Sequence, residues 1–409
     1  MNLVVIGAQW GDEGKGKIVD YLAREADIVV RYSGGANAGH TVVTDDTTYK
    51  LHLVPSGIIY PDKIVVLGIG MVIDPEALFN ELNMLEKMDV RWKGRVLISD
   101  RAHITLPQYK KIDMEMDAKR KRPIGTTGRG IGVTYAMKAQ RDGVRVVDVL
   151  DRSLLKELNH EDSSFISGYI DRISEMTIDT SSYLFKNMQK NILFEGAQGV
   201  LLDPDLGTYP YVSSGYSSAA GASQGSGIGP KSIDRIIGVC KAYSTRVGNG
   251  PFPTEFKKER DGQLEEKIRE KGREYGVTTG RPRRCGYLDM VALRYACRTN
   301  CIDSLALTHL DVYDEMDELK ACVAYEYQGK KVEEFPASLE VLNKATPVLI
   351  TFKGWKTAIG SCRSFDELPR KARKYIEFIE EFTGTPVDII SVGYERKQTI
   401  LRREMWIKY

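Results

Sequence analysis

Residues 2–24 read NLVVIGAQWGDEGKGKIVDYLAR, an apolar run followed by a glycine-rich loop and a helical pattern. The run Asn2–Ile6 is almost continuously apolar, which is typical of a strand buried on both faces of a parallel sheet. Residues 7–17 hold four glycines, and Ile18–Arg24 spaces its apolar side chains along one helical face. The segment therefore predicts a strand–loop–helix unit.

Similar strand-like runs and helical patterns alternate through the rest of the chain. We expect an α/β fold with a large, mostly parallel central sheet flanked by helices. No Pro/Ser-rich linker interrupts the sequence, so we expect a single domain over residues 1–409, with insertions. The polar, serine-rich stretch 159–182 is where we expect the least order. Further strands are expected at 27–32, 63–68, 95–99, 191–194, 304–308, 322–327, 348–352 and 387–392, and helices at 75–88, 109–122, 231–242, 264–272 and 288–300.

The composition is that of an ordinary soluble chain with a local excess of glycine. Its 58 Lys and Arg against 56 Asp and Glu give a net charge of +2, which argues against nucleic acid or any other partner recognised by charge alone. Glycine, with 38 residues, lies above its average of roughly 7%, and proline, with 15, lies below its roughly 5%. Glycine is therefore expected at particular sites, not in a disordered chain.

Membrane and secretory features are not expected. The longest apolar run, 64–73, is about half of the roughly 20 residues that a membrane span needs. The apolar N-terminus lacks a basic leader and is expected to be a buried strand, not a signal peptide. The six cysteines include no CxxC pair, so we expect reduced thiols and a cytoplasmic location.

The loop after the first strand has the spacing of a phosphate site. Residues 11–17, GDEGKGK, match G-x-x-x-x-G-K between a strand and a helix, where backbone N–H groups converge on phosphate. The P-loop pattern requires Ser or Thr next, to hold Mg²⁺, but Ile18 stands there. A metal at this loop must find oxygen elsewhere, and Asp12 and Glu13 are the nearest carboxylates.

A second glycine cluster carries a histidine. His40 follows the strand ending near Tyr32, within SGGANAGHT at 33–41. Among small residues after a strand, it is predicted to be a proton donor or an oxygen stabiliser, since histidine titrates near neutral pH. Its pairing with Asp12, one strand away, favours this interpretation over a structural histidine.

Seven motifs together resemble the adenylosuccinate synthetase family. They follow the family's order over nearly the whole chain: GDEGKGK (11–17), NAGHT (37–41), GTTGRGIG (125–132), FEGAQG (194–199), GTYPYV (207–212), STRVGNGPFPTE (244–255) and VTTGRPRR (277–284). The resemblance implies a homodimer that converts IMP, L-aspartate and GTP to adenylosuccinate, GDP and phosphate with Mg²⁺. This is the first committed step from IMP to AMP.

The resemblance also implies roles for the two candidate catalytic residues. Asp12 matches a base that removes the N1 proton while the 6-oxygen attacks the γ-phosphate, giving 6-phosphoryl-IMP. His40 matches an acid that stabilises charge on phosphoryl and purine oxygens. The metal is implied between the Asp12 side chain and the Gly39 carbonyl.

The remaining implied contacts divide among three ligands. Arg141 is implied to reach IMP from the partner subunit. The GTP set is Gly11, Asp12, Glu13, Gly14, Lys15, Gly16, Lys17, Gly39, His40, Thr41, Arg283, His309, Leu310, Asp311, Ser391, Val392 and Gly393. The IMP set is Asp12, Glu13, Gly14, Lys15, Asn37, Ala38, Gly39, His40, Thr127, Arg141, Gln198, Ser213 and Arg281. The aspartate set is Val277, Thr278, Thr279, Gly280, Arg281, Pro282 and Arg283.

Three residues depart from the family's usual pattern. His309 replaces a lysine that would lie over the guanine ring, while Asp311 can still accept from guanine N1 and N2. Ser213 replaces a frequent threonine and keeps the hydroxyl. Pro282 stands between two arginines and is expected to stiffen the aspartate loop, because proline fixes φ near −65°.

Without the resemblance, three other interpretations of the glycine loop stay open. A P-loop GTPase or kinase would use residues 11–17 for a nucleotide, but Ile18 and the loop's own acids count against it. A Rossmann oxidoreductase would need a third glycine at the required spacing. A nucleotide-binding protein without turnover has no need of an acid and base pair beside phosphate.

Overall fold

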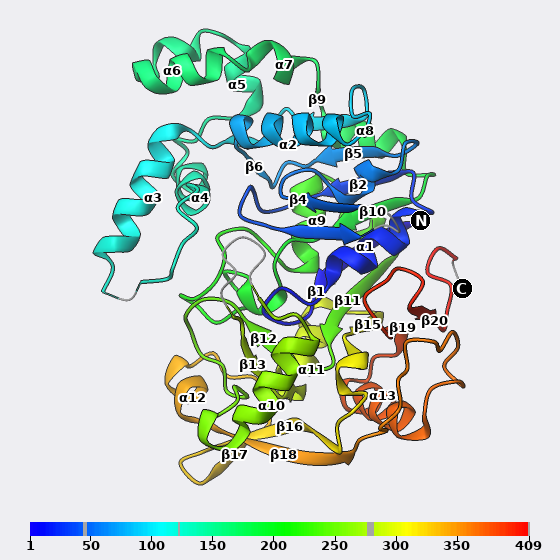
Figure 1. Ribbon diagram of the computed structural model, residues 1–409. Coiled ribbons are helices and arrows are strands. Elements are labelled where there is room, and N and C mark those ends of the chain that lie inside the picture. Colours follow the sequence, from blue (N-terminus) through cyan, green and yellow to red (C-terminus); the bar gives the residue numbers. More distant parts are fainter. Residues whose placement is uncertain (44–46, 122, 276–281, 408–409) are drawn as a thin grey trace.

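The computed structural model describes residues 1–43, 47–121, 123–275 and 282–407. Within them a ten-stranded sheet runs through the molecule in the order β20-β19-β15-β11-β1-β10-β2-β5-β7-β9 (Figure 1). Neighbouring strands are parallel except the edge strand β20, which is antiparallel to β19. The expected mostly parallel sheet is confirmed. The strands are β1 (Asn2–Gly7), β2 (Ile28–Arg31), β5 (Ile64–Leu67), β7 (Val96–Ser99), β9 (Thr177–Ile178), β10 (Ile192–Glu195), β11 (Arg235–Lys241), β15 (Ser304–Thr308), β19 (Val387–Ser391) and β20 (Thr399–Leu401).

Strand β1 lies inside the sheet and is buried on both faces. Leu3 pairs with Leu193 of β10 and with Arg235 of β11. Because side chains alternate along a strand, Val4 and Ile6 enter one hydrophobic core and Leu3 and Val5 enter another. All four are fully buried, and each such side chain contributes about 1.5–3 kcal/mol relative to exposure.

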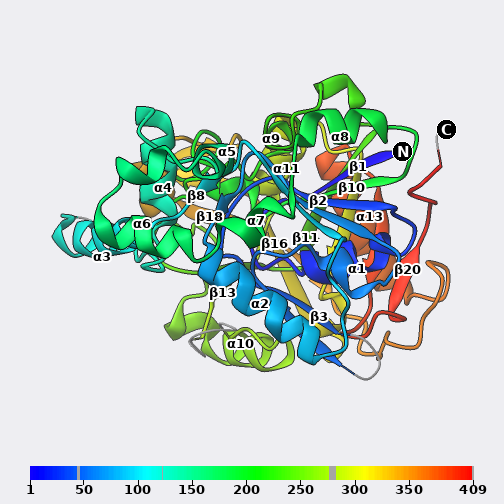
Figure 2. The ribbon, with the colours of Figure 1, turned by 90° about the horizontal axis from the view of Figure 1, so that it is seen from above.

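Helices cover the sheet and extend beyond it. Helices α5, α6 and α7 lie above the sheet in Figure 1, and α3 and α4 lie to its left. In the view from above, α3, α4 and α6 lie on one side, and α13 and β20 lie on the other (Figure 2). The helices are α1 (Lys15–Ala23), α2 (Pro75–Lys87), α3 (Pro107–Lys119), α4 (Ile131–Gln140), α5 (Val146–Leu150), α6 (His160–Ser167), α7 (Ile170–Ser174), α8 (Thr180–Lys186), α9 (Ala219–Ser226), α10 (Lys258–Lys271), α11 (Met290–Asn300), α12 (Leu339–Lys344) and α13 (Arg370–Thr383).

Smaller sheets complete the architecture. β14 (Leu288–Asp289), β16 (Glu318–Tyr327), β17 (Lys330–Val332) and β18 (Thr346–Lys353) form a second sheet, in which β16 is antiparallel to β17 and β18. The two-stranded pairs are β3 (His40–Val43) with β4 (Thr48–Leu51), β6 (Val72–Ile73) with β8 (His103–Ile104), and β12 (Ser244–Arg246) with β13 (Arg284–Gly286). In the part of the chain that is described, no helix has the length and apolarity to cross a bilayer.

Two expectations about local structure are wrong. The helix expected at 231–242 is strand β11, because Ile236, Ile237 and Val239 are β-branched and pair between β1 and β15. A short buried apolar run cannot be distinguished from a buried helix by its period alone. The stretch 159–182 is ordered and holds α6, α7, β9 and the start of α8, where Asn159 and Asp179 cap helices with their side chains.

The parallel sheet brings distant segments to one edge. Ligands of open α/β sheets bind beyond the carboxyl ends of the strands, because the connecting loops meet there. The residues that end the central parallel strands are Gly7, Arg31, Glu195, Lys241, Thr308 and Ser391. Every sequence motif assigned to a ligand that directly follows one of these strands therefore lies at this edge.

Candidate active site

The glycine loop turns around a buried carboxylate. Gly11 and Gly14 adopt left-handed φ angles of 84° and 85°, and Asp12 adopts 57°. These turns direct the Glu13 side chain into the protein, where it is fully buried. Its Oε1 accepts hydrogen bonds from the backbone N–H groups of Gln9 (3.1 Å) and Gly11 (2.8 Å). The loop is thus held from within by one acidic side chain.

The Glu13 carboxylate also forms an ion pair with Lys15, the first lysine of the loop. Lys15 Nζ lies 2.5 Å from Glu13 Oε2, and only 6% of the Lys15 side chain is exposed. Asp12, in contrast, has 37% of its side chain exposed. Of the two acids in the loop, Asp12 is therefore the one that a ligand or metal can reach.

The second lysine of the loop joins it to the C-terminal part of the sheet. Lys17 Nζ donates to Ser391 Oγ (2.7 Å) and to the carbonyl oxygens of Gly393 (2.8 Å) and Gln398 (2.9 Å). Burial lowers the pKa of Lys17 to about 8, although nearby Asp311 acts in the opposite direction. Two predicted GTP segments, 11–17 and 391–393, are thereby brought together.

Asp12 contacts a predicted ligand-binding arginine. Arg283 Nε lies 2.7 Å from Asp12 Oδ2, and Arg283 Nη1 donates to Glu274 Oε2 at 2.9 Å. Glu274 is fully buried, and Lys241 Nζ lies 2.5 Å from its Oε1. Burial alone would raise the pKa of Glu274, but Lys241 and its other partners lower it to about 2. The Glu274 carboxylate is therefore ionised across the physiological range.

His40 is oriented by a second buried carboxylate. It begins β3, and its Nδ1 forms a close pair with Oε1 of Glu195 at the end of β10. Glu195 also accepts from the Ser56 backbone N–H (2.8 Å) and hydroxyl (3.1 Å). Burial acts to raise the pKa of Glu195, but His40 and Arg31 hold it below its ordinary value. A carboxylate at Nδ1 fixes a proton there and leaves Nε2 for other chemistry.

The loop around residues 33–39 presents polar atoms without protein partners. Arg129 of the 125–132 motif donates to the Ala36 carbonyl oxygen, which joins that motif to this loop. In the described residues, Asn37 Oδ1 and Gln198 Oε1 are buried and lack a hydrogen-bond partner. Buried polar atoms are normally satisfied, so both atoms fit a polar ligand. Gly39 is exposed, and a Cβ added at this position would meet no atom of the described residues within 4 Å.

Three other residues of the predicted IMP set are exposed or half-buried. Thr127 is exposed in the loop before α4, and Ser213 is half-buried, with its N–H bonded to the Leu202 carbonyl oxygen at 2.7 Å. Arg141 is exposed at the end of α4 with a φ of 74°. Within the described residues, no hydrogen bond or ion pair joins Thr127 or Arg141 to the phosphate loop.

The predicted guanine segment borders a cavity of about 350 Å³. His309 has a φ of 56°, Leu310 is fully buried, and Asp311 lines the cavity. Burial and the nearby Lys241 lower the pKa of His309 to about 3, so its imidazole is neutral. Burial raises the pKa of Asp311 above its ordinary value. The other lining residues are Lys271, Asp314, Glu315, Lys356, Thr357 and Ala358.

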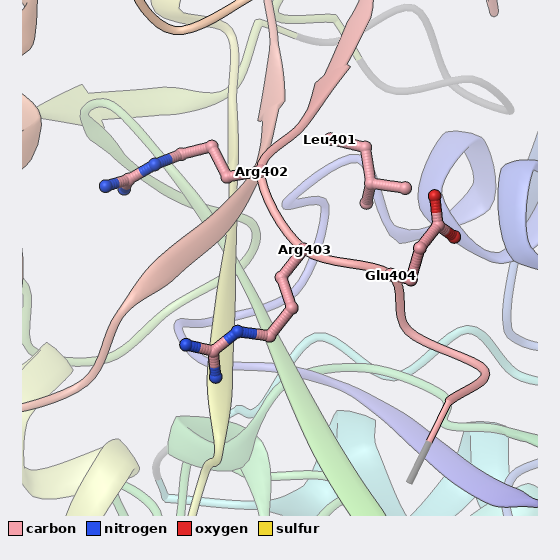
Figure 3. A pocket seen from close by; sticks show the side chains of 4 residues that line it. All are labelled: Leu401, Arg402, Arg403 and Glu404. Atoms are coloured by element: carbon pink, nitrogen blue, oxygen red, sulfur yellow. The ribbon is translucent and has the colours of Figure 1, made fainter. Parts of the chain in front are cut away.

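A larger hollow, of about 620 Å³, lies at Leu401–Glu404 but belongs to another part of the molecule (Figure 3). The Arg402 N–H bonds to the Asp388 carbonyl oxygen, near the start of β19. The hollow is therefore at the amino end of that strand, opposite the edge where the ligand motifs meet.

Three polar residues of the site were not predicted. Glu195 lies inside the FEGAQG motif. Its position at the end of a predicted strand could have indicated that it belongs to the site. Lys241 ends β11, which the sequence had suggested to be a helix. Glu274 lies three residues before Val277, the first residue of the predicted aspartate loop. Of that loop, Val277, Thr278, Thr279, Gly280 and Arg281 lie outside the described residues, while Pro282 is exposed beside Arg283.

Comparison with known proteins places this geometry in a family. The model of the family described as adenylosuccinate synthetase matches residues 4–400. The chain is 48% identical to adenylosuccinate synthetase of Synechococcus sp. (strain RCC307) over 427 residues, covering 98% of this chain and 96% of the relative. It is also 48% identical over 427 residues to that of Clostridium novyi (strain NT), covering 98% and 99%.

Comparison with solved structures gives the same family as comparison with the sequence relatives. The fully ligated adenylosuccinate synthetase from Plasmodium falciparum is 38% identical, with a TM-score of 0.90 over 98% of this chain and 100% of that one. A cyanophage S-2L succinoaminodeoxyadenylate synthetase, bound to dGMP and dATP, is 19% identical, with a TM-score of 0.64 over 98% and 95%. The second likeness shows a shared fold alone.

The packing of the phosphate loop on Gly199 can be tested by adding one methyl group. In Gly199→Ala, the new Cβ would overlap the Gln9 carbonyl oxygen and lie 2.5 Å from both Gly11 N and Glu13 Oε1. We expect the free energy of unfolding, measured in urea, to fall by about 1–3 kcal/mol, because the backbone must shift. Gly229→Ala is the control, since its Cβ meets nothing within 4 Å and its φ is −70°. Equal stability of the two variants would contradict the packing described.

Proposed function

The chain belongs to the adenylosuccinate synthetase family, and we propose that this ligase uses GTP to join L-aspartate to IMP, giving adenylosuccinate, GDP and phosphate. The observation that carries the proposal is the accessible Asp12 carboxylate on a phosphate loop, with a carboxylate-oriented His40 on the strand packed against it. A Cβ on Gly16 of α1 would lie 3.0 Å from the Thr41 carbonyl oxygen of β3, so the two segments touch.

The proposed reaction has two steps. Asp12 takes the N1 proton of IMP while the 6-oxygen attacks the γ-phosphorus of GTP, forming 6-phosphoryl-IMP and releasing GDP. The aspartate amine then attacks C6, the C6–O bond breaks, and phosphate leaves as the amine loses a proton. His40, held by Glu195, stabilises charge on the phosphoryl and purine oxygens. Positioned proton transfer of this kind contributes about 10²–10⁴ in rate. The product makes this the first committed step from IMP to AMP.

The residues fit a magnesium site. Mg²⁺ is commonly held by one or two protein oxygens together with water and substrate phosphate. The Asp12 carboxylate and the Gly39 carbonyl are the two exposed candidates, and the described residues contain no cluster of three or more His, Cys, Asp or Glu. When bound, Mg²⁺ would neutralise charge on the GTP phosphates. The protein would add to this neutralisation through Lys15, which Glu13 holds in place, and through N–H groups of the loop other than that of Gly11, which bonds to Glu13.

The other ligand assignments follow the same edge of the sheet. The phosphates of GTP bind residues 11–17. The guanine base lies beside Asp311, whose carboxylate accepts hydrogen bonds from guanine N1 and N2. The neutral imidazole of His309 lies against the guanine ring. IMP bonds to Asn37 Oδ1 and Gln198 Oε1, which have no hydrogen-bond partner within the described part of the chain, and to Thr127 and Ser213. Aspartate is held by residues 277–283. Arg141 reaches the IMP site of the second subunit of a homodimer.

An assay with each substrate left out in turn tests the reaction. We expect adenylosuccinate, followed by its ultraviolet absorbance, only when IMP, aspartate and GTP are all present with Mg²⁺. Phosphate release from GTP at an equal rate without IMP or aspartate would instead indicate a P-loop GTPase. With ATP in place of GTP we expect little product, since Asp311 can accept from guanine N1 and N2 but finds no matching donors on adenine.

Substitution of the catalytic pair tests the mechanism. We expect Asp12→Ala and His40→Ala each to lower kcat by about 10²-fold or more, since each removes a proton-transfer group. Glu195→Gln should lower kcat with little change in KM, because it keeps the shape but weakens the hold on His40. Asp366→Ala, at a side chain that is 92% exposed, serves as the control. Near-wild-type turnover of Asp12→Ala would exclude the proposed base.

Mixed dimers test the role of Arg141. Arg141→Leu and Asp12→Ala should each be inactive alone, because every site lacks one necessary group. When the two are mixed and allowed to exchange subunits, one site of each heterodimer regains both groups, and activity should partly return. Absence of recovery in heterodimers confirmed by mass would remove Arg141 from the partner's site.

A further inference from the structure

Glu274 receives three hydrogen-bonding side chains although none of its atoms is exposed. Its Oε1 lies 2.5 Å from both Lys241 Nζ and the Tyr243 hydroxyl. Its Oε2 accepts from Arg283 Nη1 at 2.9 Å. We name Glu274, Lys241, Tyr243 and Arg283 the Glu274 cluster. Two cations and one hydroxyl thus converge on a single buried carboxylate.

The cluster fixes the direction of the Arg283 side chain. Glu274 engages only Nη1, so the Nε edge of the guanidinium is turned toward Asp12, 2.7 Å away. The backbone is held as well, because the Arg283 N–H bonds to the Glu274 carbonyl oxygen at 2.9 Å and Tyr275 pairs with Pro282. These contacts do not involve Asp12, so we expect them to hold Arg283 in place when Asp12 turns to another partner.

The Glu274 cluster also contacts His309, on the guanine side of the proposed GTP site. The Tyr243 hydroxyl lies 3.5 Å from His309 Nδ1, and the two rings meet edge to face at 5.9 Å between centroids. Lys241 ends β11, and its N–H bonds to Gln9 Oε1 just before the phosphate loop. One carboxylate is thus connected to the loop 11–17, to Arg283 and to His309.

We propose that Glu274 is a positioning residue that holds Arg283 ready for the anionic substrates and couples the base of the aspartate loop to the guanine side of the GTP site. The inference rests on the proposed function, since it takes GTP and aspartate as the ligands of Arg283 and its loop. Glu274 itself touches no substrate. It acts through the arginine that it orients and through Tyr243 and His309.

Glu274→Gln is the decisive variant. The glutamine side chain has the same shape but only one acceptor oxygen, and its NH₂ group would face either the Arg283 or the Lys241 donors. We expect the KM for GTP and the KM for aspartate each to rise at least tenfold, while the KM for IMP changes less than threefold. Rises of all three KM values by a similar factor, or of none, would overturn the proposal.

A matched control separates positioning from folding. Asp261 is another buried carboxylate that bonds to an arginine, Arg260, and to a tyrosine hydroxyl, that of Tyr287; within the described residues it bonds to none of the predicted ligand residues. Asp261→Asn should lower the melting temperature without changing the KM for GTP or aspartate. If it raises both KM values as much as Glu274→Gln does, the effect is general destabilisation and the proposal fails.

A double variant covers the case in which the lone change prevents folding. Lys241→Met with Glu274→Gln removes the uncompensated buried cation, so the melting temperature should recover while the KM for GTP stays at least tenfold raised. A wild-type KM in the double variant would show that Glu274 only balances Lys241, and would overturn the proposal. If the wild-type enzyme forms no adenylosuccinate, the proposed function fails. Calorimetric titration with GTP then decides the role of Glu274, with tenfold weaker binding expected and equal binding contradicting it.

Discussion

The inward-facing carboxylate of Glu13 is the constraint on which the rest of the site depends. A full charge without exposure to water must be paired, and Lys15 together with the N–H groups of Gln9 and Gly11 supplies that pairing. The carboxylate also occupies the space where side chains on Gly7 and Gly199 would lie. The need for glycine at the end of β1 (Gly7) and in the loop after β10 (Gly199), together with the course of the glycine loop, therefore follows from one side chain. The neighbouring acid, Asp12, is exposed.

Three buried carboxylates organise the site around that loop, and each holds one or two different basic side chains. Glu13 holds Lys15, Glu195 holds His40, and Glu274 holds Lys241 and Arg283. These carboxylates hold basic side chains at fixed positions along the edge of the sheet where anionic ligands are proposed to bind, while the net charge of the protein is only +2. Because Asp12 pairs with Arg283 in the structure, this pair must separate in the proposed reaction before Asp12 can accept a proton.

The sequence was sufficient for the fold class and for the motifs, but not for the groups that support them. Residues 2–24 predicted the first strand, loop and helix because period, glycine spacing and order along the chain are local properties. The sequence predicted a helix where the structure has β11, because a buried parallel strand and a buried helix have a similar apolar composition. Glu195 and Glu274 were missed because their importance lies in partners far away in sequence, His40 and Lys241, which only the folded sheet brings near. The role of residues 277–281 in binding aspartate stays a prediction.

The pairing of β1 has a consequence for how the protein is made. Its two neighbours in the sheet begin at residues 192 and 235, so β1 leaves the ribosome long before either partner has been synthesised. During that interval its two apolar faces are open to other chains, and contacts of such long sequence separation form slowly. The strand inside the finished sheet is thus, in the nascent polypeptide, an apolar segment whose two partners are both synthesised much later.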